Sequence, residues 1–205
     1  YLHEIYSPWD VDKVIVNSRS AEMIKYVNNS LLATQISTIN EYSNIAKTIG
    51  GIDFNSVMDA VHLDKRWTPI DKLTCKRIYP EIITYLKPGC GFGGSCFPKD
   101  VMALAALSKE VGLDPVILDS VIKVNQLQPK VILEYLEERV GSLKYKNIFL
   151  LGLAFKPETD DVRESVSIKI MEYLNSQDCN ISAHDPISIN NVKKIIDFEV
   201  NYVSD

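Results

Sequence analysis

The chain has 205 residues, of which 46% are hydrophobic and 24% are charged, enough apolar surface for the core of one or two domains. Its net charge of -5 argues against nucleic-acid binding by bulk electrostatics. No apolar run reaches the roughly 18 residues that a membrane span needs, and no signal-peptide pattern opens the chain. The four cysteines lack a paired CxxC spacing, which predicts neither a zinc site nor a disulfide framework. We therefore expect a cytoplasmic, reduced chain that binds no metal, membrane or nucleic acid.

The first third of the chain predicts one very long helix. Residues 1–19 have the character of a connector, and Ser20 is the expected N-cap of a helix over 20–49 that Gly50 and Gly51 end. The apolar residues of this helix drift around its axis, which is typical of a helix at the centre of a bundle or an interface. A short helix over 53–61 follows. Residues 62–76 are polar and irregular, and Pro80 leaves 78–86 open between helix and loop.

The remainder changes from a helical pattern to an alternating one. Helices are expected over 98–111, 115–128 and 129–140, the last two joined at a proline, and then a strand of the buried parallel type over 146–153, a helix over 164–177 and a strand over 180–184. The predicted fold is therefore a mainly α domain, with a long core helix in a bundle, followed by the start of a Rossmann-like α/β domain.

Residues 91–100 read GFGGSCFPKD and form the main candidate for covalent chemistry. The glycines permit positive φ, and Pro98 lacks an amide proton that the first helical turn does not use, so Cys96 should lie at or next to a helix N-cap. The free amides and the dipole there favour a thiolate. Asp100, four residues later, could accept a proton from water that attacks a Cys96 adduct. The alternatives are a buried, inert thiol and a carboxylate that only caps the helix.

Three blocks in the same order resemble the UDP-glucose/GDP-mannose dehydrogenase family, and most closely its UDP-glucose 6-dehydrogenase group. GFGGSCFPKD resembles the catalytic-cysteine signature of the family. Residues 21–47 resemble the long central helix, and LGLAFKPETDDVRES, residues 151–165, resembles the start of the nucleotide-sugar-binding domain. The resemblance implies a connector over 1–19 from a missing NAD-binding domain, a helical dimerisation and catalytic domain over 20–145, and a partial nucleotide-sugar-binding α/β domain over 146–205.

The resemblance also implies roles for residues that are ambiguous by themselves. Lys25 and Asn29 lie one turn apart on a helix, where they could be a solvated polar face or could stabilise an oxyanion, and the family match favours the second. The implied substrate-binding residues are Tyr85, Lys87, Gly89, Gly91, Gly93 and Lys156, and Arg163 is implied to contact the cofactor NAD. An arginine from the neighbouring subunit should be Arg66, with Arg77 as the alternative, because an inserted stretch separates Arg66 from Tyr85.

These residues predict part of an NAD-dependent enzyme that oxidises the C6 alcohol of a nucleotide sugar to a carboxylate through a cysteine adduct. UDP-glucose is the expected substrate, with GDP-mannose or a UDP-N-acetylhexosamine as alternatives. No GxGxxG turn opens a helix in this sequence, so the piece by itself should not turn over substrate. The isolated piece could instead be a non-enzymatic association module. In either case we expect a homodimer formed through the helix over 20–49.

Overall fold

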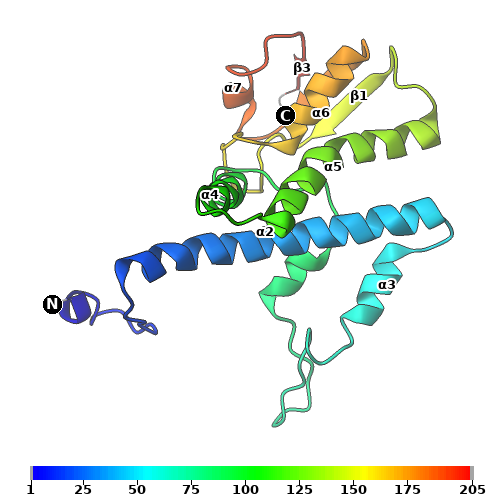
Figure 1. The fold of residues 1–205 in the computed structure, drawn as a ribbon. Helices are drawn as coiled ribbons and strands as arrows, with labels where there is room; N and C mark the ends of the chain where they lie inside the picture. Colours follow the sequence, from blue (N-terminus) through cyan, green and yellow to red (C-terminus); the bar gives the residue numbers. More distant parts are fainter. Residues whose placement is uncertain (1, 204–205) are drawn as a thin grey trace.

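The computed structural model describes residues 2–203 as a helical part joined to a small α/β part, which confirms the expected fold class (Figure 1). The helical part contains α1 (Leu2–Ile5), α2 (Ser18–Ile49), α3 (Phe54–Val61), the 3-10 helix η1 (Glu81–Leu86), α4 (Phe97–Glu110) and α5 (Val116–Val140). The α/β part contains β1 (Asn147–Leu151), α6 (Val166–Ser176), β2 (Asn180–His184), α7 (Ile189–Val192) and β3 (Asn201–Tyr202). Among the described residues, no helix has the length and apolar character to cross a membrane.

The helix α2 is 32 residues long and is the axis of the helical part. It begins two residues before the predicted start, and the prediction that Ser20 is its N-cap is wrong. Asn17 is the cap, because its extended backbone lets its side-chain oxygen accept a hydrogen bond of 2.9 Å from the amide of Ser20. Gly50, with φ of +79°, ends the helix as predicted.

Two small apolar cores hold the other helices against α2. The first joins α2, α4 and α5 around Ala33, Phe92, Val101 and Val121. The second joins α2 to α3 and η1 around Ile39, Met58 and Leu86. α3 and the loop after it therefore lie on the opposite side of α2 from the sheet (Figure 1).

The helix α5 is continuous from Val116 to Val140, so the predicted break at Pro129 is wrong. A proline inside a helix removes one backbone hydrogen bond and crowds the preceding turn, at a cost of about 3 kcal/mol. Tertiary burial outweighs this cost, because α5 is anchored on both sides of the proline. Val121 is buried in the helical part, whereas Leu133 is buried in the core of the α/β part.

The three strands are parallel and lie in the order β1-β2-β3. Helix α6 covers one face with Ile168, Met171 and Leu174, which pack in one core with residues of the sheet. The prediction of a parallel strand at β1 is confirmed, but its burial on both faces is not. Phe149 and Leu151 alternate with partly buried neighbours and are 51% and 75% exposed, because the described helices cover a single face of the strand.

Candidate active site

The turn before α4 places Cys96 at the surface at the start of a helix. Gly91 and Gly94 have φ of +97° and +79°, which an L residue rarely adopts, and they turn the chain into the helix. Cys96 is the N-cap of α4 with an exposed side chain, and Pro98 lies in the first turn, both as the sequence predicts. The alternative of a buried, inert thiol therefore does not describe Cys96.

Asp100 is fully buried and gathers three polar side chains around its carboxylate. The Nδ2 atom of Asn29 donates a hydrogen bond of 2.6 Å to Oδ2, and Lys25 Nζ lies 3.9 Å from the same oxygen. Lys99 forms an ion pair with Oδ1. Helix α2 thus supplies two predicted residues to the first turn of α4, although 71 positions separate Asn29 from Asp100 in the sequence.

The surroundings of Asp100 keep it ionised. Burial alone would raise the pKa of its carboxyl group, but hydrogen bonds from Lys99 and Asn29, and the positive charges of Lys99 and Lys25, outweigh burial and lower the pKa below its usual value. A carboxylate with a lowered pKa accepts hydrogen bonds well and is a weak base. Asp100 is therefore suited to orienting a water molecule.

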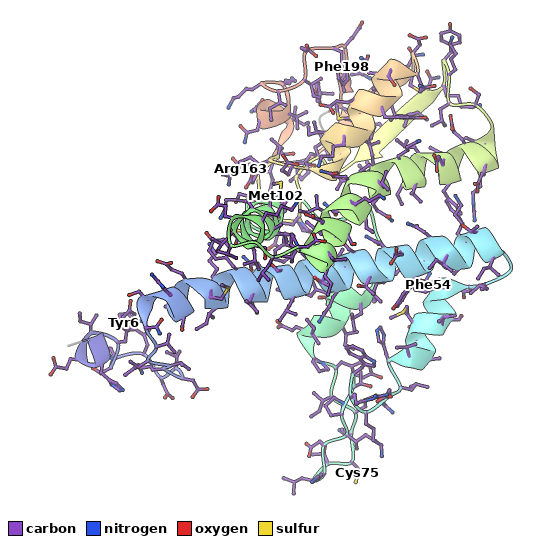
Figure 2. All side chains as sticks on the ribbon, viewed as in Figure 1. Tyr6, Phe54, Cys75, Met102, Arg163 and Phe198 are labelled. Carbon is purple, nitrogen blue, oxygen red and sulfur yellow. The ribbon has the colours of Figure 1, made fainter. Side chains whose placement is uncertain are left out.

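Two cations lie within electrostatic reach of Cys96. The pKa of Lys99 is raised chiefly by its hydrogen bond to Asp100, and Cys96 adds to that increase. The pKa of Arg163 is raised chiefly by its hydrogen bond to Asp161, again with a contribution from Cys96. Arg163 lies beside α4, far from the protruding loop that bears Cys75 (Figure 2). The side chain of Arg163 is 68% exposed, which suits it to an anionic group near the thiol.

Buried amide side chains that the sequence analysis missed hold the turn in place. Asn125 on α5 accepts a hydrogen bond of 2.8 Å from the amide of Phe92 and donates one of 3.0 Å to its carbonyl oxygen. Asn40 accepts from the amide of Gly89, and Gln128 donates to its carbonyl oxygen, each at 2.8 Å. The only signal for these contacts in the sequence was that Asn125 and Gln128 lie three residues apart, and hence on one face of a largely apolar helix.

The predicted substrate residues lie around this turn. The ring of Tyr85 lies near that of Phe97 in a tilted arrangement, with ring centroids 6.3 Å apart, whereas Lys87 is exposed. Lys156 Nζ lies 5.6 Å from the ring centroid of Phe155. The amide of Gly89 is already satisfied by Asn40, so it offers no free donor to a phosphate in this conformation. Gly91 and Gly93 flank Phe92 in the same turn.

The two candidate arginines differ in how their guanidinium groups are bonded and how far their side chains are exposed. Arg77 donates from one guanidinium nitrogen to the carbonyl oxygens of Leu63 and Thr68, both at 2.9 Å, and so closes the loop after α3. Arg66 is paired with Asp64 and its side chain is 86% exposed. This pairing lowers the pKa of Asp64 to about 2. Arg66 is therefore the arginine that is available to another molecule, and its loop lies across α2 from the sheet (Figure 1).

Fold and site together define a class of protein, in which a helical domain with an exposed cysteine at the start of a helix joins a small parallel α/β unit. Residues 19–127 match the model of the UDP-glucose/GDP-mannose dehydrogenase family, central domain, and residues 149–205 match that of its UDP binding domain. The chain belongs to the UDP-glucose/GDP-mannose dehydrogenase family. The sequence-based recognition of that family is thereby confirmed.

Individual relatives agree with this assignment. The chain is 41% identical over 201 residues to the UDP-glucose 6-dehydrogenase YwqF of Bacillus subtilis, a match that covers 98% of this chain and 42% of that protein. TuaD of the same organism, also a UDP-glucose 6-dehydrogenase, is 38% identical over 204 residues, with 100% and 41% covered. The structure of a UDP-glucose dehydrogenase from Pyrobaculum islandicum has a TM-score of 0.86 and 37% identity, and the match covers 100% of this chain and 44% of that one. The chain thus spans less than half the length of these relatives.

Proposed function

We propose that the whole protein is an NAD-dependent dehydrogenase that oxidises the C6 alcohol of UDP-glucose to the carboxylate. The observation that carries this proposal is the exposed Cys96 at the N-cap of α4, one turn before the buried Asp100, on which Asn29 and Lys25 converge. The names of the relatives, which are UDP-glucose 6-dehydrogenases, support the choice of substrate. GDP-mannose and UDP-N-acetylhexosamines remain the alternatives within the family.

Cys96 retains the intermediate between two oxidations. The first removes a proton and a hydride from the C6 alcohol and leaves an aldehyde. The Cys96 sulfur then bonds to the aldehyde carbon to give a thiohemiacetal, whose carbon loses the second hydride to give a thioester. Water attacks the thioester, the carbon–sulfur bond breaks, and carboxylate and thiolate are released.

The cluster around Asp100 stabilises charge and orients water in this scheme. Lys25 is 64% exposed on its side chain, so its ammonium can move to an oxyanion at C6 while Asn29 stays bonded to Asp100. Because its pKa is lowered, Asp100 remains a carboxylate, and when Lys25 moves away from Oδ2 this oxygen can accept a hydrogen bond from the attacking water. Asn29 keeps one Nδ2 hydrogen on Asp100 and donates the other to the oxyanion, so that it acts with Lys25 as the oxyanion site.

Two molecules of NAD, bound one after the other, would each supply the acceptor for one hydride. Of the described residues, Arg163 fits a dinucleotide, because its exposed cation lies within electrostatic reach of Cys96. Lys156, Lys87 and Tyr85 surround the turn on the substrate side and suit a diphosphate and a base. The glycines at 89, 91 and 93 let the chain pass close to that ligand, and Arg66 reaches the site of the neighbouring subunit.

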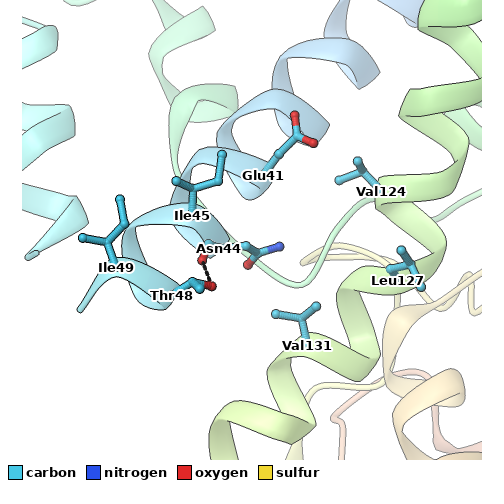
Figure 3. Close-up of a pocket in the computed structure, with 8 residues that line it drawn as sticks. All are labelled: Glu41, Asn44, Ile45, Thr48, Ile49, Val124, Leu127 and Val131. Carbon is cyan, nitrogen blue, oxygen red and sulfur yellow. Dashed lines mark hydrogen bonds between the residues drawn. The ribbon is translucent and has the colours of Figure 1, made fainter.

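The neighbouring subunit would bind along α2. The N-terminal half of the helix exposes Met23, Ile24, Val27 and Leu31. Near its other end, an apolar groove of about 390 Å³ lies between α2 and α5, lined by Ile45, Ile49, Val124, Leu127 and Val131 among others (Figure 3). A homodimer would bury these side chains. Sedimentation velocity of the chain at micromolar concentration should show a dimer that Leu127→Glu dissociates and Leu73→Glu leaves intact, and a monomeric wild type would refute this.

The enzymatic proposal is tested in the full-length protein with UDP-glucose. Cys96→Ser should lose acid formation and stop after the first oxidation or at an ester adduct, whereas the control Cys90→Ser should form acid normally. Unchanged acid formation by Cys96→Ser would refute the mechanism. Parallel assays with GDP-mannose and UDP-N-acetylglucosamine test the choice of substrate.

The second candidate is a non-enzymatic association module. It is favoured by the apolar side chains of α2 that are exposed in the isolated chain. Such a module needs no reactive thiol. Alkylation of the chain at neutral pH distinguishes the two, because the enzymatic proposal expects Cys96 to react faster than Cys75, which is also exposed.

A further inference from the structure

The loop after β1 packs directly against the glycine turn that leads to Cys96. The amide of Gly94 donates a hydrogen bond of 2.9 Å to the carbonyl oxygen of Arg163. The ring of Phe155 covers the same glycine so closely that a Cβ atom there would lie 2.7 Å from the ring. Gly94 is therefore required for contact as well as for its positive φ.

Gly93 makes a second close approach to the same loop. A Cβ atom at Gly93 would lie 2.2 Å from the carbonyl oxygen of Glu164 and 3.3 Å from the Cβ of Phe155. Two consecutive glycines thus lie against backbone and ring atoms of residues 155–164. Because Cys96 follows two residues after Gly94, a shift of this contact would move the thiol.

The loop is stiff enough to act as a support. The amide of Phe155 donates to the carbonyl oxygen of Asp161 at 3.2 Å, and Arg163 binds the Asp161 carboxylate through two nitrogens at 2.9 and 2.7 Å. At the start of the loop, the amides of Leu153 and Ala154 donate to Asp185. The support therefore belongs to the α/β part, whereas the thiol belongs to the helical part.

We propose that Phe155 is a positioning residue for Cys96, which it aligns by packing its ring on Gly94. The proposal deepens the function proposed above and rests on it for the role of the thiol. It also gives the two parts of the chain a physical coupling, because Lys156 and Arg163 lie on the same loop as Phe155. A nucleotide sugar bound by that loop would hold the ring, and hence the thiol, in one orientation.

The test compares Phe155→Ala with Phe149→Ala, which removes a ring from the exposed face of β1 in the same part of the chain. Iodoacetamide alkylation of the 205-residue chain is followed across pH 6 to 10 by peptide mass spectrometry, so that each cysteine reports separately. Phe155→Ala should change the rate at Cys96 by about fivefold or more and move the midpoint of its pH–rate profile, because the thiol leaves its place at the helix N-terminus. Phe155→Tyr should restore both, and Phe149→Ala should change neither.

Cys179 reports on folding in the same samples, because it lies partly buried beside the sheet. A Cys96 rate and midpoint that stay unchanged in Phe155→Ala, with Cys179 still protected, would overturn the proposal. If Phe155→Ala exposes Cys179, the same alkylation measurement is made on Phe155→Leu, which keeps most of the apolar volume and removes the flat ring. Alkylation needs no turnover, so a full-length protein that fails to oxidise UDP-glucose refutes the proposed function without deciding the role of Phe155.

In the full-length protein, the same substitution should lower kcat for acid formation by about 10-fold to 100-fold, because small displacements of reacting groups are costly. KM for UDP-glucose should change less than kcat, because the ring packs closely on the turn that leads to the thiol, whereas its contact with Lys156 is a single long one of 5.6 Å. A rise in KM with unchanged kcat would assign Phe155 to substrate binding and overturn the positioning role.

Discussion

Asp185 is a buried carboxylate whose replacement should weaken the α/β part strongly. One oxygen accepts hydrogen bonds from the amides of Leu153 and Ala154 at 2.8 and 3.3 Å, and the other accepts from Ile187 and Ser188 at 2.9 and 2.7 Å. The carboxylate thereby ties the end of β1 to the turn after β2. Asp185→Asn keeps one acceptor oxygen and turns a new N–H₂ group toward two of these amides.

The size of the effect follows from those contacts. A hydrogen bond to a charged group contributes about 1.5–3 kcal/mol, and the long bond to Ala154 counts for less, so the loss of one strong and one weak bond predicts about 3 kcal/mol. The measurement is urea unfolding of the wild type and Asp185→Asn, followed by circular dichroism at pH 7. Asp197→Asn, a change in an exposed carboxyl of the same part, serves as the control and should alter the free energy of unfolding by less than about 0.5 kcal/mol.

The pH dependence supplies a second criterion with a definite sign. Burial would raise the pKa of Asp185, but hydrogen bonds led by those from the amides of Leu153, Ile187 and Ser188 outweigh it and hold the pKa well below its usual value. A lowered pKa in the folded state adds stability above the unfolded pKa, about 3.9, and that stability is lost as pH falls through the folded pKa. The difference between wild type and Asp185→Asn should therefore shrink below about pH 4. A difference under about 1 kcal/mol at pH 7, or one that stays constant down to pH 3, would refute the reasoning.

Three further predictions concern stability. Gly94→Ala should lower the free energy of unfolding by about 3 kcal/mol, because it combines a positive φ with a clash against the Phe155 ring, whereas Gly112→Ala, with φ of +81° and open space, should cost about 1 kcal/mol. Equal costs at the two glycines would exclude the clash. Asn125→Ala should cost about 2 kcal/mol in urea unfolding, because it leaves two buried backbone groups unpaired; a cost under about 0.5 kcal/mol would contradict that pairing. Leu73→Ser should leave the melting temperature within about 2 °C, since Leu73 is 95% exposed, and a larger drop would mean that its loop is packed in solution.

Local signals in the sequence were reliable where the residues of a short segment by themselves determine its backbone conformation. The glycines and Pro98 were enough to predict that Cys96 starts a helix, because positive φ and a missing amide proton are properties of single residues. The same holds for the end of α2 at Gly50. The error at Ser20 was also local, since Asn17 is an equally good cap and the pattern of apolar residues does not separate positions three apart.

Long-range contacts decided what local signals could not. Pro129 predicts a break, and burial of α5 in both parts of the chain overrides it. The continuous apolar run at β1 predicts cover on both faces, and only the arrangement of helices shows that Phe149 and Leu151 are exposed in this chain. Tertiary packing sums many weak contacts between distant residues, which no window of sequence contains.

The sequence by itself determined the family, the order of a helical and an α/β part, and the position of Cys96 at the start of a helix, because each depends on residue types at fixed spacing. The tertiary structure alone decided how the turn before Cys96 is held: by Asn125 from α5, by Phe155 from the loop after β1, and by a carboxylate cluster shared between α2 and α4. The partners in these contacts lie tens of residues apart, and their pairing depends on the relative placement of elements that local propensity does not specify.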